Sequence, residues 1–236
     1  MLLLFDIDGT LMRGASRAHA TALRQALKNV HGVDVEEIRL RGSAAGRTDG
    51  EIARMYLLEA GVSAERIDAR AAQVREQCCR LYASLCPADL SSLVVEGIPE
   101  LLESLNARDD AKLSLVTGNF EPVARIKLKA AGIGHWFARG QGGFGSDSDD
   151  RAVLPPIARR RAGEAAGLAT SWPREQTVVI GDTPRDIACA HADNLHCVAV
   201  TTGMYSAPEL SGADAVVGDA QALATTLESL ALAAGV

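Results

Sequence analysis

The sequence lacks any run of eighteen apolar residues, and it has no excess of basic residues. Its 236 residues carry 24 Lys and Arg against 30 Asp and Glu, so the formal net charge is −6. Nucleic-acid-binding domains usually display a basic surface, and this charge balance therefore argues against DNA or RNA as a partner. The N-terminus enters a strand-like run directly, without a basic leader segment. We expect a cytoplasmic protein with no membrane span and no nucleic-acid partner.

Paired cysteine motifs are also missing. The cysteines are five, an odd number, and none forms a C-x-x-C pair. This usage suits a reducing compartment and does not suit a disulfide framework. A zinc site within residues 189–197 is one interpretation, but Cys189 and His191 would point to different faces of a helix. The expected alternative is that the cysteines are buried apolar residues.

Apolar runs alternate with helical patterns along most of the chain. The runs predict buried strands at 2–6, 112–117, 176–181, 196–201 and 213–217. Apolar residues spaced by three and four predict helices at 97–107, 121–131, 155–166 and 184–192. Strand and helix in alternation predict an α/β fold with a Rossmann-like parallel sheet flanked by helices.

Residues 13–93 break this alternation. They carry helical patterns at 15–31, 49–60 and 64–86 and no convincing strand. A crossover between parallel strands needs far fewer residues, so we predict an inserted helical domain at 13–93 and an α/β core domain at 1–12 and 94–236. The polar, glycine-rich segment 142–150 is predicted to be irregular, either a linker or a loop of the site.

Polar residues follow three of the predicted strands. They are Asp6 and Asp8 after the first, Thr117, Gly118 and Asn119 after the second, and Asp182 and Asp186 after the third. The carboxyl ends of parallel strands meet at one edge of the sheet, so these side chains should converge. Buried carboxylates without a cation are costly, and Mg²⁺ with oxygen ligands would relieve the cost. The helix beginning near Asn119 would also offer free amides to an anion.

Structural roles are open for several of these residues. Asp6 and Asp8 could form an acidic turn, and Asn119 could cap a helix. Thr183 and Asp186 match a capping box with Pro184 at the first helical position. That role would leave Asp182 still to be explained.

Three motifs together resemble the haloacid dehalogenase superfamily. "DIDGT" at 6–10 matches its D-x-D-x-T signature, "LVTGN" at 115–119 is similar to its second motif, and "GDTPRD" at 181–186 to its fourth. The helical insertion resembles the family's cap domain, close to the phosphoglycolate phosphatase-like branch. The resemblance implies an Mg²⁺-dependent phosphatase acting on a small phosphorylated metabolite.

The resemblance also implies roles for individual residues. Asp6 would be the nucleophile that forms an aspartyl-phosphate, and Asp8 would protonate the leaving oxygen and then activate water. Thr117, Gly118 and Asn119 would hold phosphoryl oxygens. Mg²⁺ would be bound by Asp6, the carbonyl group of Asp8 and Asp182, with Asp186 linked through water.

The chain departs from the family at the third motif, where a lysine is usual. Residues 146–156 contain no lysine, and Arg151 is the best positional match. Lys127, on the helix after the second motif, and Arg159 are the alternatives. Arg151 could instead form a salt bridge with Asp149 or Asp150.

In the predicted cap, Arg47 suits a carboxylate or second phosphate of the substrate, whereas Thr48 and Glu51 match a capping box. Three other functions remain: a phosphomutase, a noncatalytic binding protein of the same fold, and a hydrolase acting at carbon and halide. The last does not need an acid at Asp8. Monomer and homodimer are both open.

Overall fold

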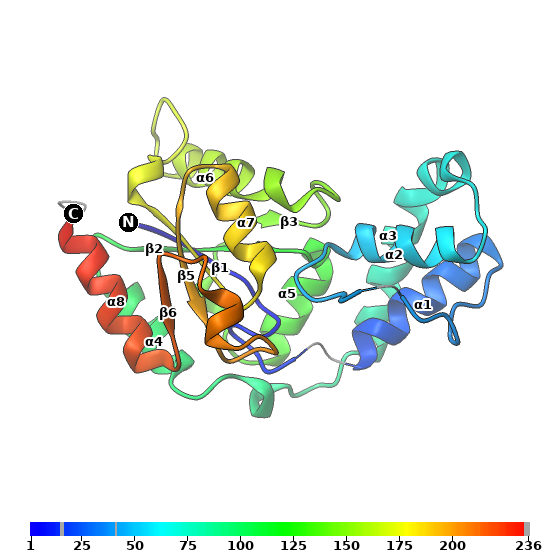
Figure 1. Ribbon diagram of the computed structural model, residues 1–236, viewed down its shortest axis with the longest axis horizontal. Helices are drawn as coiled ribbons and strands as arrows, with labels where there is room; N and C mark the ends of the chain where they lie inside the picture. Colours follow the sequence, from blue (N-terminus) through cyan, green and yellow to red (C-terminus); the bar gives the residue numbers. More distant parts are fainter. Residues whose placement is uncertain (15–16, 41, 234–236) are drawn as a thin grey trace.

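The computed structural model describes residues 1–14, 17–40 and 42–233. A six-stranded parallel sheet has the order β3-β2-β1-β4-β5-β6 (Figure 1). The strands are β1 (Leu2–Phe5), β2 (Lys112–Thr117), β3 (Gly143–Phe144), β4 (Thr177–Gly181), β5 (His196–Val200) and β6 (Ala215–Val217). β1 lies between β2 and β4, so the residues that follow these three strands are neighbours at one edge.

Helices cover both faces of the sheet. They are α4 (Ile98–Asn106), α5 (Glu121–Ala130), α6 (Leu154–Ala165), α7 (Pro184–Ala192) and α8 (Ala220–Ala233). Successive strand residues point to opposite faces. Leu3 and Phe5 accordingly pack in one core with α4, α5 and α8, whereas Leu2 and Leu4 pack in another with α6 and α7. The predicted fold class is confirmed.

Two elements differ from the sequence predictions. β3 lies inside segment 142–150, which was predicted to be irregular throughout, and it pairs with Val116 and Thr117 of β2. Two residues are too few to show an alternating pattern, which is why the sequence did not reveal it. α8 was also missed, although Leu223 and Leu227 carry the spacing of four that marks a buried helical face.

The insertion between β1 and α4 consists of α1 (Arg17–His31), α2 (Asp49–Glu59) and α3 (Ala64–Leu85). Its described residues contain no strand, and the helices lie beside the sheet (Figure 1). They share an apolar core that also takes in Phe120 and Val123 at the start of α5. Met12 and Val94 form an isolated bridge where the chain leaves the sheet region and returns to it. Among the described helices, none has the length and apolar character needed to cross a membrane.

Candidate active site

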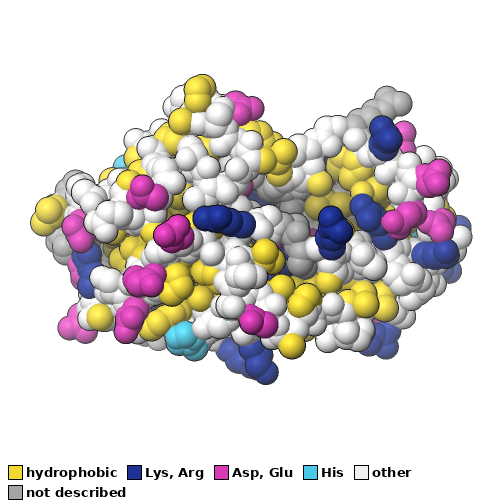
Figure 2. Space-filling view, turned by 90° about the horizontal axis from the view of Figure 1, so that it is seen from below, with side chains coloured by type: hydrophobic (Ala, Val, Ile, Leu, Met, Phe, Trp, Pro, Cys, Tyr) yellow, Lys and Arg dark blue, Asp and Glu magenta, His cyan; other side chains and the backbone are white. Residues whose placement is uncertain are grey.

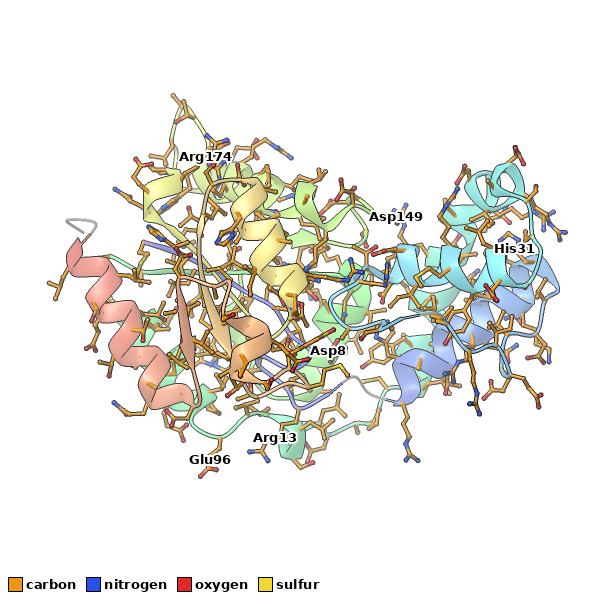
Figure 3. The ribbon with its side chains drawn as sticks, in the orientation of Figure 1. Asp8, Arg13, His31, Glu96, Asp149 and Arg174 are labelled. Carbon is orange, nitrogen blue, oxygen red and sulfur yellow. The ribbon has the colours of Figure 1, made fainter. Side chains whose placement is uncertain are left out.

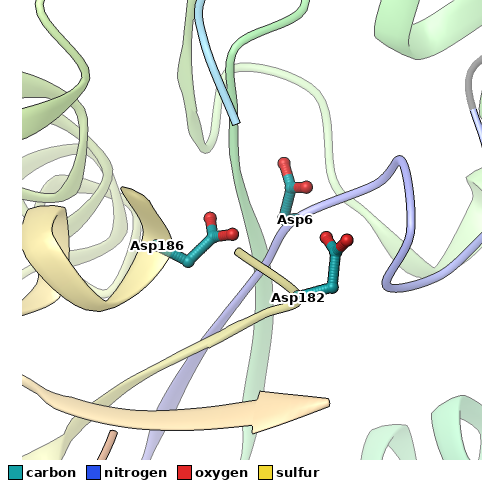
Figure 4. Close-up of side chains that lie close together, drawn as sticks. All are labelled: Asp6, Asp182 and Asp186. Carbon is teal, nitrogen blue, oxygen red and sulfur yellow. The ribbon is translucent and has the colours of Figure 1, made fainter. Parts of the chain in front are cut away.

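Three carboxylates meet at the carboxyl edge of the sheet. Asp6 follows β1, Asp182 follows β4, and Asp186 lies in the first turn of α7 (Figure 4). One carboxylate oxygen from each lies within 4.8 Å of the others, and all three side chains are buried. Within the described residues this is the one group of three acidic, His or Cys side chains with such geometry. The convergence expected from strand order is therefore present.

Burial and mutual repulsion make full ionisation of this cluster unfavourable. Burial raises the pKa of Asp182 to about 8, and the neighbouring Asp6 and Asp186 add to the shift. Burial also raises the pKa of Asp6, against the opposing charge of Arg151. A divalent cation between these carboxylates would reverse both shifts, because an adjacent opposite charge favours the ionised form. The donor set, hard oxygen atoms with excess negative charge, fits Mg²⁺.

Asp186 is already hydrogen-bonded within the protein. Its Oδ2 accepts from the amide of Thr183 at 3.0 Å and from the hydroxyl at 2.7 Å, and its Oδ1 is paired with Arg151. Thr183 and Asp186 form the capping box expected as the structural alternative. The geometry thus leaves Asp6 and Asp182 with more capacity for a metal ion than Asp186, for which the sequence predicts a link to the ion through water.

Arg151 joins Asp6 to Asp186. Its Nη2 lies 3.1 Å from Oδ1 of Asp6, and the same nitrogen pairs with Asp186. Arg151 is 8% exposed, and its Nε has no hydrogen-bond partner among the residues that the structure describes. The alternative salt bridge to Asp149 or Asp150 does not form: Asp150 instead accepts from the amide of Ala152. A buried cation in contact with Asp6 and lining the cavity is suited to an anionic ligand.

A second cation serves Asp8. Lys127, from α5, is 1% exposed, and its Nζ lies 2.6 and 2.8 Å from the two carboxylate oxygens of Asp8. Asn119 donates to Asp8 at 3.0 Å and accepts from Lys127 at 2.8 Å. Burial opposes ionisation of Asp8, but Lys127, His19 and these hydrogen bonds together hold its pKa below the usual value. Figure 3 shows Asp8 where the sheet meets the inserted helices.

The three candidates for the cation of the third motif each pair with a different carboxylate. Arg151 contacts Asp6 and Lys127 contacts Asp8, so both lie in the site. Arg159 is paired with Asp193 at 2.7 Å and is not part of it. Sequence position alone favoured one cation, whereas the structure places two beside different carboxylates.

The loop after β2 is closely packed. Thr117 is 1% exposed, and its Oγ1 accepts from the amide of Asn119 at 3.3 Å. The amides of Phe120 and Glu121, where α5 begins, donate to side chains of Asp49 and Ser146. These two amides are not available to an anion, contrary to the simple picture of an open helix N-terminus.

A cavity of about 610 Å³ opens above the carboxylates, between the sheet and the inserted helices. Residues predicted for the site that line it are Asp6, Asp8, Arg47, Thr117, Gly118, Asn119, Arg151 and Asp182. Lining residues that the sequence reasoning missed include Arg13, His19, Arg24, Asp49 and Met204. Figure 2 shows basic side chains on both parts of the molecule near the middle of one face.

Arg47 lines this cavity with a partner of its own. Its guanidinium pairs with the Glu51 carboxylate, and its Nε donates to the carbonyl oxygen of Ser43 at 3.0 Å. Thr48 caps α2 as expected, accepting from the amide of Glu51 at 3.1 Å. A substrate anion at Arg47 would have to compete with Glu51.

The zinc site considered at residues 189–197 is not formed by the described residues. Cys189 is buried, its Sγ donates to the carbonyl oxygen of Asp186, and burial raises its pKa to about 12. His191 lies on the surface near Asp214 at 3.5 Å. These side chains do not converge, and the apolar alternative holds for Cys189.

The sequence and fold can now be compared with known proteins. A family model described as haloacid dehalogenase-like hydrolase matches residues 3–191, and one described as HAD-hydrolase-like matches residues 155–229. A phosphoglycolate phosphatase of Rhodospirillum rubrum is 28% identical over 221 residues, which cover 92% of this chain and 86% of that protein.

Solved structures show the same fold. A hydrolase from Pseudomonas syringae has a TM-score of 0.62 at 23% identity, covering 96% of this chain and 97% of that one. A β-phosphoglucomutase from Clostridium difficile has a TM-score of 0.63 at 16% identity, covering 98% and 97%.

Fold and site together define a parallel α/β enzyme with an acidic centre at the carboxyl edge of its sheet. The family model spans the motifs at Asp6, Thr117 and Asp182 and most of the chain. The chain belongs to the haloacid dehalogenase-like hydrolase family, as its motifs indicated.

Proposed function

We propose that the protein is an Mg²⁺-dependent phosphomonoester hydrolase that acts through an aspartyl-phosphate on Asp6. The proposal rests mainly on one observation: the buried carboxylates of Asp6 and Asp182 lie close together at the floor of the cavity, beside the guanidinium of Arg151. Residues 13–93 would form a cap domain over a core of 1–12 and 94–236. Cytoplasmic location and a monomeric or homodimeric state remain predictions.

Asp6 and Asp182, with the carbonyl group of Asp8, would hold the ion. When bound, Mg²⁺ would neutralise charge on the phosphoryl oxygens. A carboxylate oxygen of Asp6 attacks phosphorus, and the bond to the ester oxygen breaks. Asp8 is ionised in the free site, so it takes up a proton as the anionic substrate binds, because nearby negative charge raises the pKa of a carboxyl group. It then gives this proton to the ester oxygen. Asp8 then takes a proton from water, which attacks phosphorus and releases Asp6 and inorganic phosphate.

The cations and the loop after β2 would stabilise charge during transfer. Arg151 contacts Asp6 through Nη2, and fixed donors of this kind act where negative charge develops. The Thr117 hydroxyl would contact a phosphoryl oxygen. Lys127 holds Asp8 rather than Asp6, so its place is beside the acid and base.

The proposed substrate is a small phosphorylated metabolite. The relative from Rhodospirillum rubrum makes 2-phosphoglycolate the first compound to test, followed by sugar phosphates and nucleotides. A phosphomutase remains the alternative, because the acceptor of the phosphoryl group can be water or a sugar hydroxyl. Incubation with β-glucose 1-phosphate separates the two: a hydrolase releases phosphate, and a mutase yields glucose 6-phosphate.

The direct test is phosphate release from p-nitrophenyl phosphate with and without Mg²⁺. We expect activity with Mg²⁺ and its loss in excess EDTA, restored by further Mg²⁺. An inactive wild-type protein, or activity that EDTA leaves unchanged, would contradict the proposal.

The metal-free protein should lose stability as pH rises. Asp6 and Asp182 have raised pKa values when folded, so the folded state retains protons that the unfolded chain loses above its own pKa of about 3.8. This stabilising contribution is complete below that pH and is lost as pH rises through about 8. Tm of the EDTA-treated protein should fall across that window in differential scanning fluorimetry.

Mg²⁺ should offset this loss most strongly at the alkaline end, where protons no longer compete. At about a hundred times Kd it should raise Tm by about 5–10 °C. In Asp182→Asn the pH slope and the Mg²⁺ response should both shrink. An equal response at acidic and alkaline pH would argue against a metal ion at these carboxylates.

Arg47→Ala should raise KM about tenfold or more for the best substrate in the panel if the substrate carries a second anion, with kcat nearly unchanged. Arg47 lines the cavity and forms its ion pair with Glu51, not with Asp6. Arg54→Ala is the matched control, since Arg54 lies on α2 nearby in the chain but pairs with Asp68 outside that cavity. An unchanged KM in Arg47→Ala would remove Arg47 from substrate binding.

A further inference from the structure

The segment that enters α2 is hydrogen-bonded to the loop that follows β2. The amide of Asp49 donates to the carbonyl oxygen of Gly118 at 2.8 Å, and its carboxylate Oδ2 accepts from the amide of Phe120 at 2.7 Å. Asp49 is 3% exposed. A Cβ atom on Gly118 would lie 2.1 Å from the carbonyl oxygen of Arg47, so the two backbones pack without room for a side chain. Asp49 is therefore hydrogen-bonded to the residues on both sides of Asn119.

The same carboxylate oxygen also connects a third element. Oδ2 of Asp49 lies 3.1 Å from Nε2 of His19, which is on α1 and is buried. One oxygen atom therefore joins α1, the first turn of α2 and the loop after β2. This is more than a helix N-terminus needs, because capping of α2 is already provided by Thr48.

Asn119 connects the loop after β2 to Asp8. Its side chain donates to Asp8 at 3.0 Å and accepts from Lys127 at 2.8 Å. Asn119 is 8% exposed, and Asp49, His19, Asn119 and Asp8 all line the same cavity. Two hydrogen bonds therefore connect the inserted helices to the proposed acid: one joins Asp49 to the amide of Phe120, and the other joins the neighbouring Asn119 to Asp8.

We propose that Asp49 is a positioning residue: by holding the Gly118–Phe120 loop it sets the place of Asn119, and through Asn119 it aims the carboxyl group of Asp8 at the leaving oxygen. The inference rests on the proposed function, in which Asp8 protonates that oxygen. It follows that the orientation of Asp8 depends on the contact between the start of α2 and the loop after β2, in addition to its direct pair with Lys127. The inserted helices then govern proton transfer as well as enclosing the substrate.

Two aryl phosphates of similar shape test this. p-Nitrophenyl phosphate has a leaving group that departs without a proton, whereas phenyl phosphate has a basic leaving group that needs one. Asp49→Ser is too short to reach the amide of Phe120, and we expect it to lower kcat/KM for phenyl phosphate about tenfold more than for p-nitrophenyl phosphate. That is a fraction of the ~10²–10⁴ that general acid catalysis contributes. Asp49→Asn keeps an acceptor, so its selective loss should be smaller, about twofold to threefold.

The matched control is Arg75→Ala. Arg75, on α3, donates from Nη1 to the carbonyl oxygen of Ser146 at 2.8 Å, so this variant also loses a contact between the inserted helices and the sheet region. The contact involves neither the start of α2 nor the Gly118–Phe120 loop, and any loss in Arg75→Ala should be equal for the two substrates.

A loss in Asp49→Ser that is equal for both substrates, or no loss, would overturn the inference and leave the proposed function intact. If Asp49→Ser does not fold, Asp49→Asn decides, and a ratio of kcat/KM values equal to that of wild type overturns the inference. Asp8→Asn is the reference for complete loss of the acid. A wild-type enzyme that hydrolyses neither aryl phosphate would overturn the proposed function and this inference together.

Discussion

Asp6→Asn should abolish phosphate release while leaving the protein folded. An amide in place of the carboxylate cannot form the acyl phosphate, so we expect kcat to fall by about 10⁴ or more. The change keeps the size of a side chain that is 4% exposed. It also removes one of the carboxylates whose repulsion raises the pKa of Asp182. The change also breaks the Asp6–Arg151 pair, which opposes this gain, while Arg151 keeps its pair with Asp186. Tm in EDTA should therefore stay close to that of wild type.

The measurement pairs phosphate release with thermal unfolding in the same buffer. Asp34→Asn is the control, because Asp34 is a surface carboxylate paired with Lys28 and lies away from the cavity. It should keep full activity. Activity of Asp6→Asn above about a hundredth of wild type would contradict a nucleophilic role for Asp6.

Arg151→Met should lower both activity and stability. Loss of a preorganised donor beside the phosphoryl group costs about 10²–10³ in kcat. The change also leaves Asp6 and Asp186 without their shared buried cation, and breaking a buried ion pair costs about 3–5 kcal/mol. Kinetics should be measured at saturating Mg²⁺, well below the lowered Tm.

Arg151→Lys separates the two effects. Its ammonium group keeps the positive charge but cannot span Asp6 and Asp186 with the same planar fork, so we expect partial activity and most of the stability. If Arg151→Met retains wild-type kcat, Arg151 has a structural role and Lys127 becomes the candidate for stabilising the phosphoryl group.

The positions of the strand ends account for what the sequence could predict. Asp6 follows the buried strand β1, Thr117 ends β2 and Asp182 follows β4, so the strand order requires these residues to meet, whatever the details of packing. The capping box at Thr183 followed from local sequence alone. Such features depend on periodicity and on contacts close in the chain.

Side-chain partners distant in sequence could not be predicted. Lys127 meets Asp8 across 119 residues, and Asp49 meets Phe120 across 71. Neither pair leaves a periodic signal, because each depends on how α5 and the inserted helices pack against the loop after β2. Gly203 could have been predicted from the sequence, because it follows the strand β5. A Cβ atom at this position would lie 1.8 Å from Oδ2 of Asp182, so this strand end also belongs to the site.

The most direct test of the account is to find where the phosphoryl group goes. Enzyme mixed with substrate and Mg²⁺, quenched in acid within one turnover and digested, can be examined by tandem mass spectrometry. We predict a phosphoryl group on the carboxylate of Asp6, absent from Asp6→Asn. A phosphoryl group on another side chain, or turnover without any phosphorylated enzyme, would contradict the central claim.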